Sequence, residues 1–281
     1  PSMAALSRGT ALANFCEDDY VVSPYIWEFW NTVSSLVISA VGVLGLLTAR
    51  RTQLPASLKV LYTVLIGIGL GSAYFHGSQS HAGQLCDELP MMVFVLVLFY
   101  NLVSVHPTLR HSKILLMALP WVLASYGVAT IGFMVVAAES AAFFRVAFGV
   151  IAASCILLEV RLWRLHAESI PRWLLATSIS LFLVAFGLWI ADHQLCPQLR
   201  AMGPLNPQLH AHWHMLSGVS CHWVIAWLSY VHFKVARVDK LGARRVDSSI
   251  LPVTIGYAPI ARHVMPLVVP GVDVSDILRV D

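Results

Sequence analysis

The chain has 281 residues, of which 58% are hydrophobic and 12% are charged, well below the roughly 25% charged residues of soluble domains. This composition excludes a soluble globular domain and predicts an integral membrane protein. The formal net charge of +3 is small and no basic run is interleaved with aromatic residues, so we expect no nucleic-acid partner.

Residues 1–28 precede the first long apolar stretch and form the predicted N-terminal segment. They lack a continuous apolar run, so we expect no signal peptide and expect the first membrane segment to direct targeting. Glu17 and Asp19 lie in an acidic loop, and Glu28 opens the first apolar stretch. Closely spaced oxygen donors suit calcium, but the spacing is not that of an EF-hand. A solvated acidic loop is therefore the alternative interpretation.

Seven apolar stretches follow, each long enough to cross the hydrocarbon core of a bilayer, which takes about 20 residues. They cover residues 29–49, 58–77, 87–105, 114–134, 142–163, 173–192 and 210–233. Their apolar runs are continuous and lack the two-residue alternation of barrel strands, which favours helices. We predict an all-α fold, a bundle of seven transmembrane helices over residues 29–233.

Basic residues predict the orientation of the bundle. Most of them lie around the segments that follow the odd-numbered stretches, namely Arg50, Arg51, Lys59, Arg110, Lys113, Arg161, Arg164, Arg172, Lys234, Arg237, Lys240, Arg244 and Arg245. The other segments hold only Arg8 and Arg200, and Arg145 lies beside the segment between the fourth and fifth stretches. Because cytosolic loops are enriched in Lys and Arg, we expect a lumenal or extracellular N-terminus and a cytosolic C-terminus. Residues 234–281 are predicted to be a cytosolic, mostly irregular tail, although residues 264–270 could lie on the membrane or bind a partner.

Polar residues gather at the predicted outer ends of three stretches. His76 ends the second stretch, Asp87 begins the third, and His210 and His214 begin the seventh. Because residues i and i+4 share one face of a helix, His210 and His214 can bind one cation together, with His76 as a third ligand. Three imidazoles and a water molecule form a catalytic zinc site, for which Asp87 is the candidate base and acid. Ser72, one turn before His76, faces the same direction.

Each of these residues also has a structural interpretation. The histidines could hydrogen-bond to water at helix ends, and Ser72 could bond to its own helix backbone. Asp87 could cap the third helix, with Pro90 in the first turn of that helix. Asp192 ends the sixth stretch, where we interpret it as a helix-end residue, although it could also reach the rim of the site.

Of the five cysteines, Cys16 and Cys196 lie in predicted outer segments, where a disulfide persists. We expect them to pair and to tie the N-terminal loop to the segment before the seventh stretch. Cys86, Cys155 and Cys221 lie in or at the edge of membrane stretches and are expected to be packing residues.

Four patches of this chain, taken in order, resemble the alkaline ceramidases, which are seven-span zinc amidases of the endoplasmic reticulum, Golgi and plasma membrane. The patches are Cys16–Tyr20 with Glu28–Ser34, Ser72–His76, Gln84–Pro90 and His210–His214. The resemblance runs from about Asn14 to Phe233. It implies hydrolysis of the amide bond of ceramide, a membrane lipid, to a sphingoid base and a free fatty acid.

The resemblance also implies residue roles. His76, His210 and His214 match the zinc ligands, Asp87 the acid and base, and Ser72 a hydroxyl group that helps to stabilise the oxyanion. Cys16 and Cys196 match a family disulfide. The matching calcium ligands are Asn14, Phe15 through its carbonyl group, Glu17, Asp19 and Glu28.

This chain departs from the family pattern at the calcium loop. Asn14 and Phe15 stand where members usually carry Asp and Trp, and Asp19 stands where members often carry Asn. The two changes leave the number of carboxylates the same, so we expect calcium binding to persist.

Other seven-span proteins provide alternatives. Adiponectin-receptor-like proteins and lipases that remodel glycosylphosphatidylinositol anchors also carry a three-histidine site, but the receptor group has a cytosolic N-terminus. A receptor or lipid-binding protein with a structural zinc is the non-enzymatic alternative, whereas a G-protein-coupled receptor has no role for these histidines and Asp87. We expect the endoplasmic reticulum or Golgi membrane, with the plasma membrane as the alternative, and the sequence indicates no protein partner.

Overall fold

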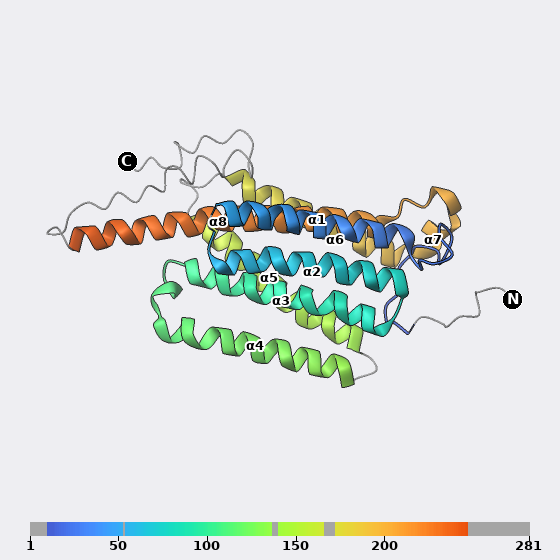
Figure 1. Ribbon diagram of the computed structural model, residues 1–281, viewed down its shortest axis with the longest axis horizontal. Coiled ribbons are helices and arrows are strands. Elements are labelled where there is room, and N and C mark those ends of the chain that lie inside the picture. Colours follow the sequence, from blue (N-terminus) through green and yellow to red (C-terminus); the bar gives the residue numbers. More distant parts are fainter. Residues whose placement is uncertain (1–9, 53, 137–139, 166–171, 247–281) are drawn as a thin grey trace.

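The computed structural model describes residues 10–52, 54–136, 140–165 and 172–246, which are helical apart from turns and loops and contain no strand (Figure 1). The long helices are α1 (Phe29–Arg51), α2 (Ala56–Ser78), α3 (His81–Val105), α4 (Lys113–Val136), α5 (Ser140–Leu165), α6 (Arg172–Gln194) and α8 (Leu209–Val246). A short helix, α7 (Cys196–Ala201), and the 3-10 turns η2 (Leu109–His111) and η3 (Gly203–Leu205) complete the described secondary structure. The all-helical prediction is confirmed for these residues.

Within the described residues, six helices, α1 to α6, are long and apolar enough to cross a membrane. They contain the first six predicted stretches. The seventh stretch lies in α8, which is not among the six, because its apolar residues are interrupted by histidines: His210, His212, His214, His222 and His232. The helix also continues past residue 233, where we predicted the tail, to Val246. Residues 1–9 and 247–281 of the predicted terminal segments lie outside the described residues.

The helices run roughly side by side (Figure 1). Helix α1 packs against α2 and α8, α2 against α3, α6 against α8, and α3 against α5. Helix α4 lies at the edge of the bundle, and side chains such as Ile114 and Trp121 are 81% and 77% exposed. Exposed large apolar side chains on spanning-length helices fit contact with lipid.

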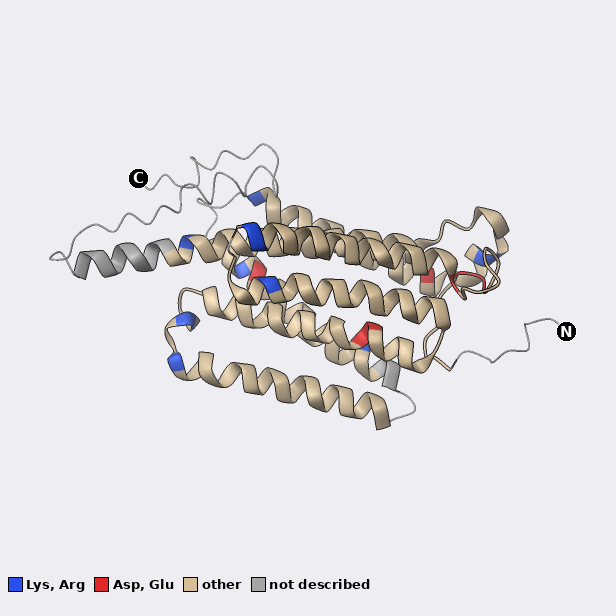
Figure 2. Cartoon of the chain, viewed as in Figure 1, with Lys and Arg blue, Asp and Glu red and all other residues tan. Residues whose placement is uncertain are grey.

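The N-terminal loop (residues 10–28), the turn between α2 and α3, and α7 lie together at one end of the bundle, here called the histidine end (Figure 1). Figure 2 shows that most of the described lysine and arginine residues lie at the opposite end. The two ends of the bundle therefore differ in charge.

Small residues bring α1 and α2 into backbone contact. A Cβ atom on Gly69 would lie 2.4 Å from the backbone nitrogen of Ser39 and 2.7 Å from the carbonyl oxygen of Ser35. A side chain at this position would push the two helices apart, so glycine fixes their separation. This close approach brings Ser35 of α1 next to Ser72 of α2, whose hydroxyl oxygens are 3.0 Å apart.

Candidate metal and catalytic site

Three histidines meet at the histidine end of the bundle. His76 comes from the last turn of α2, and His210 and His214 come from the start of α8. Their ligand atoms lie within 4.8 Å of one another, and the side chains are 0%, 3% and 3% exposed. Nε2 of His76 and Nδ1 of His210 are buried without a hydrogen-bond partner among the described residues. Because buried polar atoms are normally paired, these nitrogens fit a bound metal ion.

Glu28 holds the ring of His76. Its Oε2 lies 2.5 Å from Nδ1 of His76, and the backbone N–H of Glu28 donates to the carbonyl oxygen of His76 at 3.0 Å. A carboxylate on the far nitrogen is a common partner of a metal-binding histidine, because it fixes the tautomer and the ring orientation. Nε2 of His76 is thereby left for a metal.

Serines of α1 orient His214 in the same way. The hydroxyl group of Ser34 donates to the carbonyl oxygen of Asn31 at 3.1 Å, so its oxygen accepts from Nδ1 of His214 at 2.9 Å. The hydroxyl oxygen of Ser35 also lies 3.3 Å from this Nδ1. A proton on Nδ1 leaves Nε2 of His214 free to accept a metal ion.

Ser72 and Asp87 lie together beside the histidines. Ser72 is 2% exposed, and its hydroxyl group lies close enough to the Asp87 carboxylate to interact with it. Asp87 also interacts electrostatically with His76. The structure therefore brings all five predicted zinc-site and catalytic residues into one cluster, in which Ser72 accepts a hydrogen bond from Ser35 of α1.

The contact between α2 and α3 that joins Ser72 to Asp87 depends on Gly71 and Pro90. Pro90 lies inside α3 and has no N–H, so the carbonyl group of Cys86 lacks its usual helical donor. That carbonyl lies against Gly71, where an added Cβ atom would be 1.9 Å from its oxygen. Since Gly71 precedes Ser72 and Cys86 precedes Asp87, this contact sets the distance between the two functional groups.

The alternative interpretation of Asp87 as a helix cap is wrong. Helix α3 begins at His81, and Ser80 caps it by accepting a hydrogen bond from the backbone N–H of Gly83 at 3.0 Å. Asp87 lies in the second turn, and Pro90 lies beyond the first turn rather than in it. The polar sequence before the apolar run obscured this earlier start.

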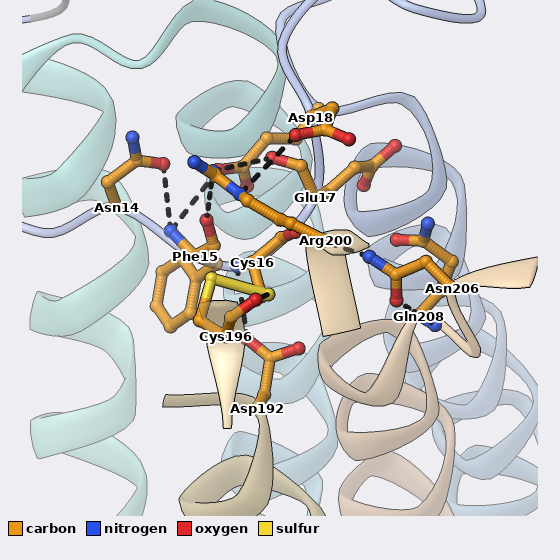
Figure 3. Close-up of a disulfide and its surroundings, with 11 residues drawn as sticks. Asn14, Phe15, Cys16, Glu17, Asp18, Asp192, Cys196, Arg200, Asn206 and Gln208 are labelled. Carbon is orange, nitrogen blue, oxygen red and sulfur yellow. Dashed lines mark hydrogen bonds and ion pairs between the residues drawn. A yellow bond between two sulfur atoms is a disulfide. The ribbon is translucent and has the colours of Figure 1, made fainter. Parts of the chain in front are cut away.

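The N-terminal loop covers the site. The ring of Phe15 stacks on His210 with centroids 3.7 Å apart and lies 5.2 Å from the ring of His76. The next residue, Cys16, forms the predicted disulfide with Cys196, which is thereby confirmed (Figure 3).

Asp192 and Arg200 hold the same loop from the other side (Figure 3). Asp192 is buried, and its Oδ2 accepts the backbone N–H of Cys16 at 3.1 Å, so this residue does more than end a helix. Arg200 donates from Nη2 to the carbonyl oxygens of Phe15 and Glu17 at 3.1 Å and 3.2 Å. The loop thus directs backbone oxygens towards a positive charge.

The predicted calcium ligands lie in and beside this loop, with most of their oxygens already bonded. Glu17 accepts the backbone N–H groups of Trp30 and Asn31 at 2.7 Å and 2.8 Å, and so stabilises the N-terminus of α1. Asn14 accepts from the backbone N–H of Phe15 at 2.8 Å. Among the described residues, the histidines are the one set of three His, Cys, Asp or Glu side chains close enough to hold a metal.

The electrostatics of the loop nevertheless fit a second cation. Burial raises the pKa of the Glu17 carboxyl group, backbone hydrogen bonds from α1 lower it, and the charge of Glu28 raises it again. Burial also raises the pKa of Asp19, and Glu28 acts in the same direction. Neighbouring carboxylates that repel one another in a partly buried loop favour binding of a hard divalent cation such as calcium.

Comparison with known proteins identifies the relatives of this chain. The family model described as Ceramidase matches residues 7–252. The putative alkaline ceramidase dcd3A of Dictyostelium discoideum is 29% identical over 88% of this chain and 97% of its own length. Alkaline ceramidase 3 of Mus musculus is 29% identical over 79% of this chain and 84% of its own length. Alkaline ceramidase YPC1 of Saccharomyces cerevisiae is 26% identical over 79% and 77%, respectively.

Proposed function

The chain belongs to the ceramidase family, and on this basis we propose that it hydrolyses the amide bond of ceramide to a sphingoid base and a free fatty acid. The observation that carries the proposal is the buried cluster of His76, His210 and His214, with Asp87 and Ser72 beside it. The relatives reported above are named alkaline ceramidases, which favours amide hydrolysis over the other seven-span lipid hydrolases and receptors.

The three histidines are the proposed ligands of a zinc ion. All-imidazole coordination suits zinc, and the hydrogen bonds of Glu28 and Ser34 orient two of the rings. A zinc ion bound there supplies a Lewis acid that polarises the substrate carbonyl and makes a water molecule more acidic.

Asp87 and Ser72 perform the proposed proton transfer and charge stabilisation. The Asp87 carboxylate accepts a proton from the attacking water and returns it to the departing amine nitrogen. The hydroxyl group of Ser72 donates a hydrogen bond to the oxygen of the substrate carbonyl as negative charge develops there. The phenyl ring of Phe15, stacked on His210, limits the entry of water from the side of the N-terminal loop.

Calcium is the proposed second metal, bound by Asn14, the carbonyl group of Phe15, Glu17, Asp19 and Glu28. The repulsion among the loop carboxylates supports this site. Glu28 also hydrogen-bonds to His76, so a cation at the loop would act on the orientation of a zinc ligand. We assign calcium a structural and regulatory role.

We further propose that α8 is a seventh span, with the N-terminus lumenal or extracellular and the C-terminus cytosolic. The concentration of basic residues at the end of the bundle opposite the N-terminal loop supports this orientation (Figure 2). A lipid substrate would enter from the bilayer between helices. The proposed location is the membrane of the endoplasmic reticulum or Golgi, and the plasma membrane is the alternative.

The test is product analysis with purified protein and a ceramide panel in water enriched in oxygen-18. Hydrolysis places the heavy oxygen in the carboxylate of the released fatty acid and yields an equal amount of sphingoid base. Release of a fatty acid without the label, or turnover confined to lipids that lack an amide, would contradict the proposal.

A further inference from the structure

Glu88, which follows Asp87 in α3, carries one satisfied and one unsatisfied carboxylate oxygen. Its Oε1 accepts a hydrogen bond from Nε2 of Gln84 at 3.0 Å. Its Oε2 is buried and has no hydrogen-bond partner among the described residues. A buried acceptor without a donor is unfavourable, so this oxygen is available to a group that the protein itself does not provide.

The orientation of Gln84 determines which oxygen of Glu88 is free. The backbone N–H of Leu12 donates to Oε1 of Gln84 at 2.8 Å, and this fixes the side-chain amide with its NH₂ group towards Glu88. Gln84 is 2% exposed, so water does not compete for this bond. The N-terminal segment and α3 together hold the Glu88 carboxylate in one position.

Glu88 also lies close to the proposed reaction. It interacts electrostatically with Asp87, which we assign as the residue that returns a proton to the amine nitrogen. Arg145 of α5 also acts electrostatically on Glu88, and α5 packs against α3. Met92, one turn further along α3, is buried, and therefore this part of the helix faces the bundle.

We propose that Oε2 of Glu88 accepts a hydrogen bond from a hydroxyl group of the sphingoid part of the substrate, which makes Glu88 a specificity-determining residue. The inference rests on the proposed function and extends it to the recognition of the substrate. In ceramide the carbon that bears the amide nitrogen is flanked by two carbons that carry hydroxyl groups. An acceptor adjacent to Asp87 is therefore positioned for one of these hydroxyls when the nitrogen faces Asp87.

The experiment compares kcat/KM for ceramide with kcat/KM for two analogues, one lacking the primary and one lacking the secondary hydroxyl group. Wild-type protein is expected to prefer ceramide to one analogue by about tenfold or more, the effect of a hydrogen bond to a charged acceptor. In Glu88→Gln the new amide keeps its oxygen on Gln84 and places an NH₂ group where Oε2 was. This variant is expected to lose most of the preference, because the carboxylate acceptor is gone and the NH₂ group can bond to the hydroxyl only by donating to its oxygen. The kcat/KM value for ceramide then falls towards that of the analogue, whose own value does not change.

Glu159→Gln is the matched control, since Glu159 is a buried glutamate near the C-terminal end of α5. It is expected to keep the wild-type preference. Thermal unfolding of both variants tests whether a loss of preference reflects a loss of fold. A preference that survives unchanged in Glu88→Gln, or wild-type protein that does not distinguish ceramide from either analogue, would overturn this inference but not the proposed function. Wild-type protein that hydrolyses none of the three would overturn the proposed function as well.

Discussion

Oε2 of Glu28 and Nδ1 of His76 lie 2.5 Å apart, and the backbone N–H of Glu28 also donates to the carbonyl oxygen of His76. Both residues are fully buried. The N-terminal end of α1 is thus attached at two points to a proposed metal ligand at the end of α2. The carboxylate of Glu28 therefore lies beside the acidic loop and also orients a proposed zinc ligand.

Replacement of Glu28 tests this relationship. Glu28→Gln removes the charge that orients His76 and should weaken zinc binding by about 10- to 100-fold, as loss of an outer-shell carboxylate does. Zinc affinity is measured by competition with a chromogenic chelator. Asp18→Asn is the matched control, because Asp18 belongs to the same loop but pairs with Arg200 at the surface. Equal zinc affinity in Glu28→Gln and wild type would show that Glu28 does not support the metal.

Asp87→Asn should separate chemistry from metal binding. The amide keeps the size of the side chain, but it cannot accept the proton of water. We expect kcat to fall by about 10²- to 10⁴-fold, the usual contribution of a general base, while zinc stays bound. Steady-state kinetics and metal analysis on the same sample check both results. Retained turnover would remove Asp87 from the mechanism.

Gly71→Ala tests the contact between α2 and α3. The new Cβ atom would lie 1.9 Å from the carbonyl oxygen of Cys86, so one helix must move. Overpacking against backbone should cost about 3 kcal/mol of stability and lower activity, because the separation of Ser72 and Asp87 changes. Gly149→Ala in α5 is the control, since nothing lies within 4 Å of its Cβ position. The check is thermal unfolding in detergent. An equal change in unfolding temperature in both variants would contradict this role of Gly71.

Calcium binding should depend on pH. The pKa values of Glu17 and Asp19 are raised, first by burial and also by the charge of Glu28. Each carboxyl group must be ionised to bind calcium, so protons compete with the ion at a higher pH than at exposed carboxylates. We expect the affinity measured by titration calorimetry to fall as the pH is lowered from neutral, and to start falling at a higher pH than it would at exposed carboxylates. A constant affinity as the pH is lowered would contradict the involvement of these two groups.

The sequence is sufficient to predict the parts of the site that have a local signal. Hydropathy predicts the six helices α1 to α6. The spacing of His210 and His214 on one helix face predicts that the two side chains lie close enough to bind the same metal ion. The position of Cys16 and Cys196 outside the apolar stretches predicts their disulfide, which the structure contains. Each of these properties depends on composition or on neighbours in the chain.

Other parts of the site depend on contacts between distant segments. Glu28 and His76 are 48 positions apart, and Asp192 and Cys16 are 176 apart, so no local pattern pairs them. Glu17 stabilises the N-terminus of α1 from outside that helix, which spacing alone does not indicate. The start of α3 was predicted too late because the polar residues before Asp87 lower the local hydropathy although they are helical.

The measurement that tests the central claim most directly is the release of sphingoid base from ceramide by wild type and His214→Ala, with bound zinc determined in both. His214 is buried and held by Ser34, and its substitution removes one of three proposed ligands. We predict that the wild type contains stoichiometric zinc and turns over ceramide, and that the variant loses both properties together. Stoichiometric zinc in the wild type without turnover of any ceramide, or full activity in a variant that lacks zinc, would contradict the account.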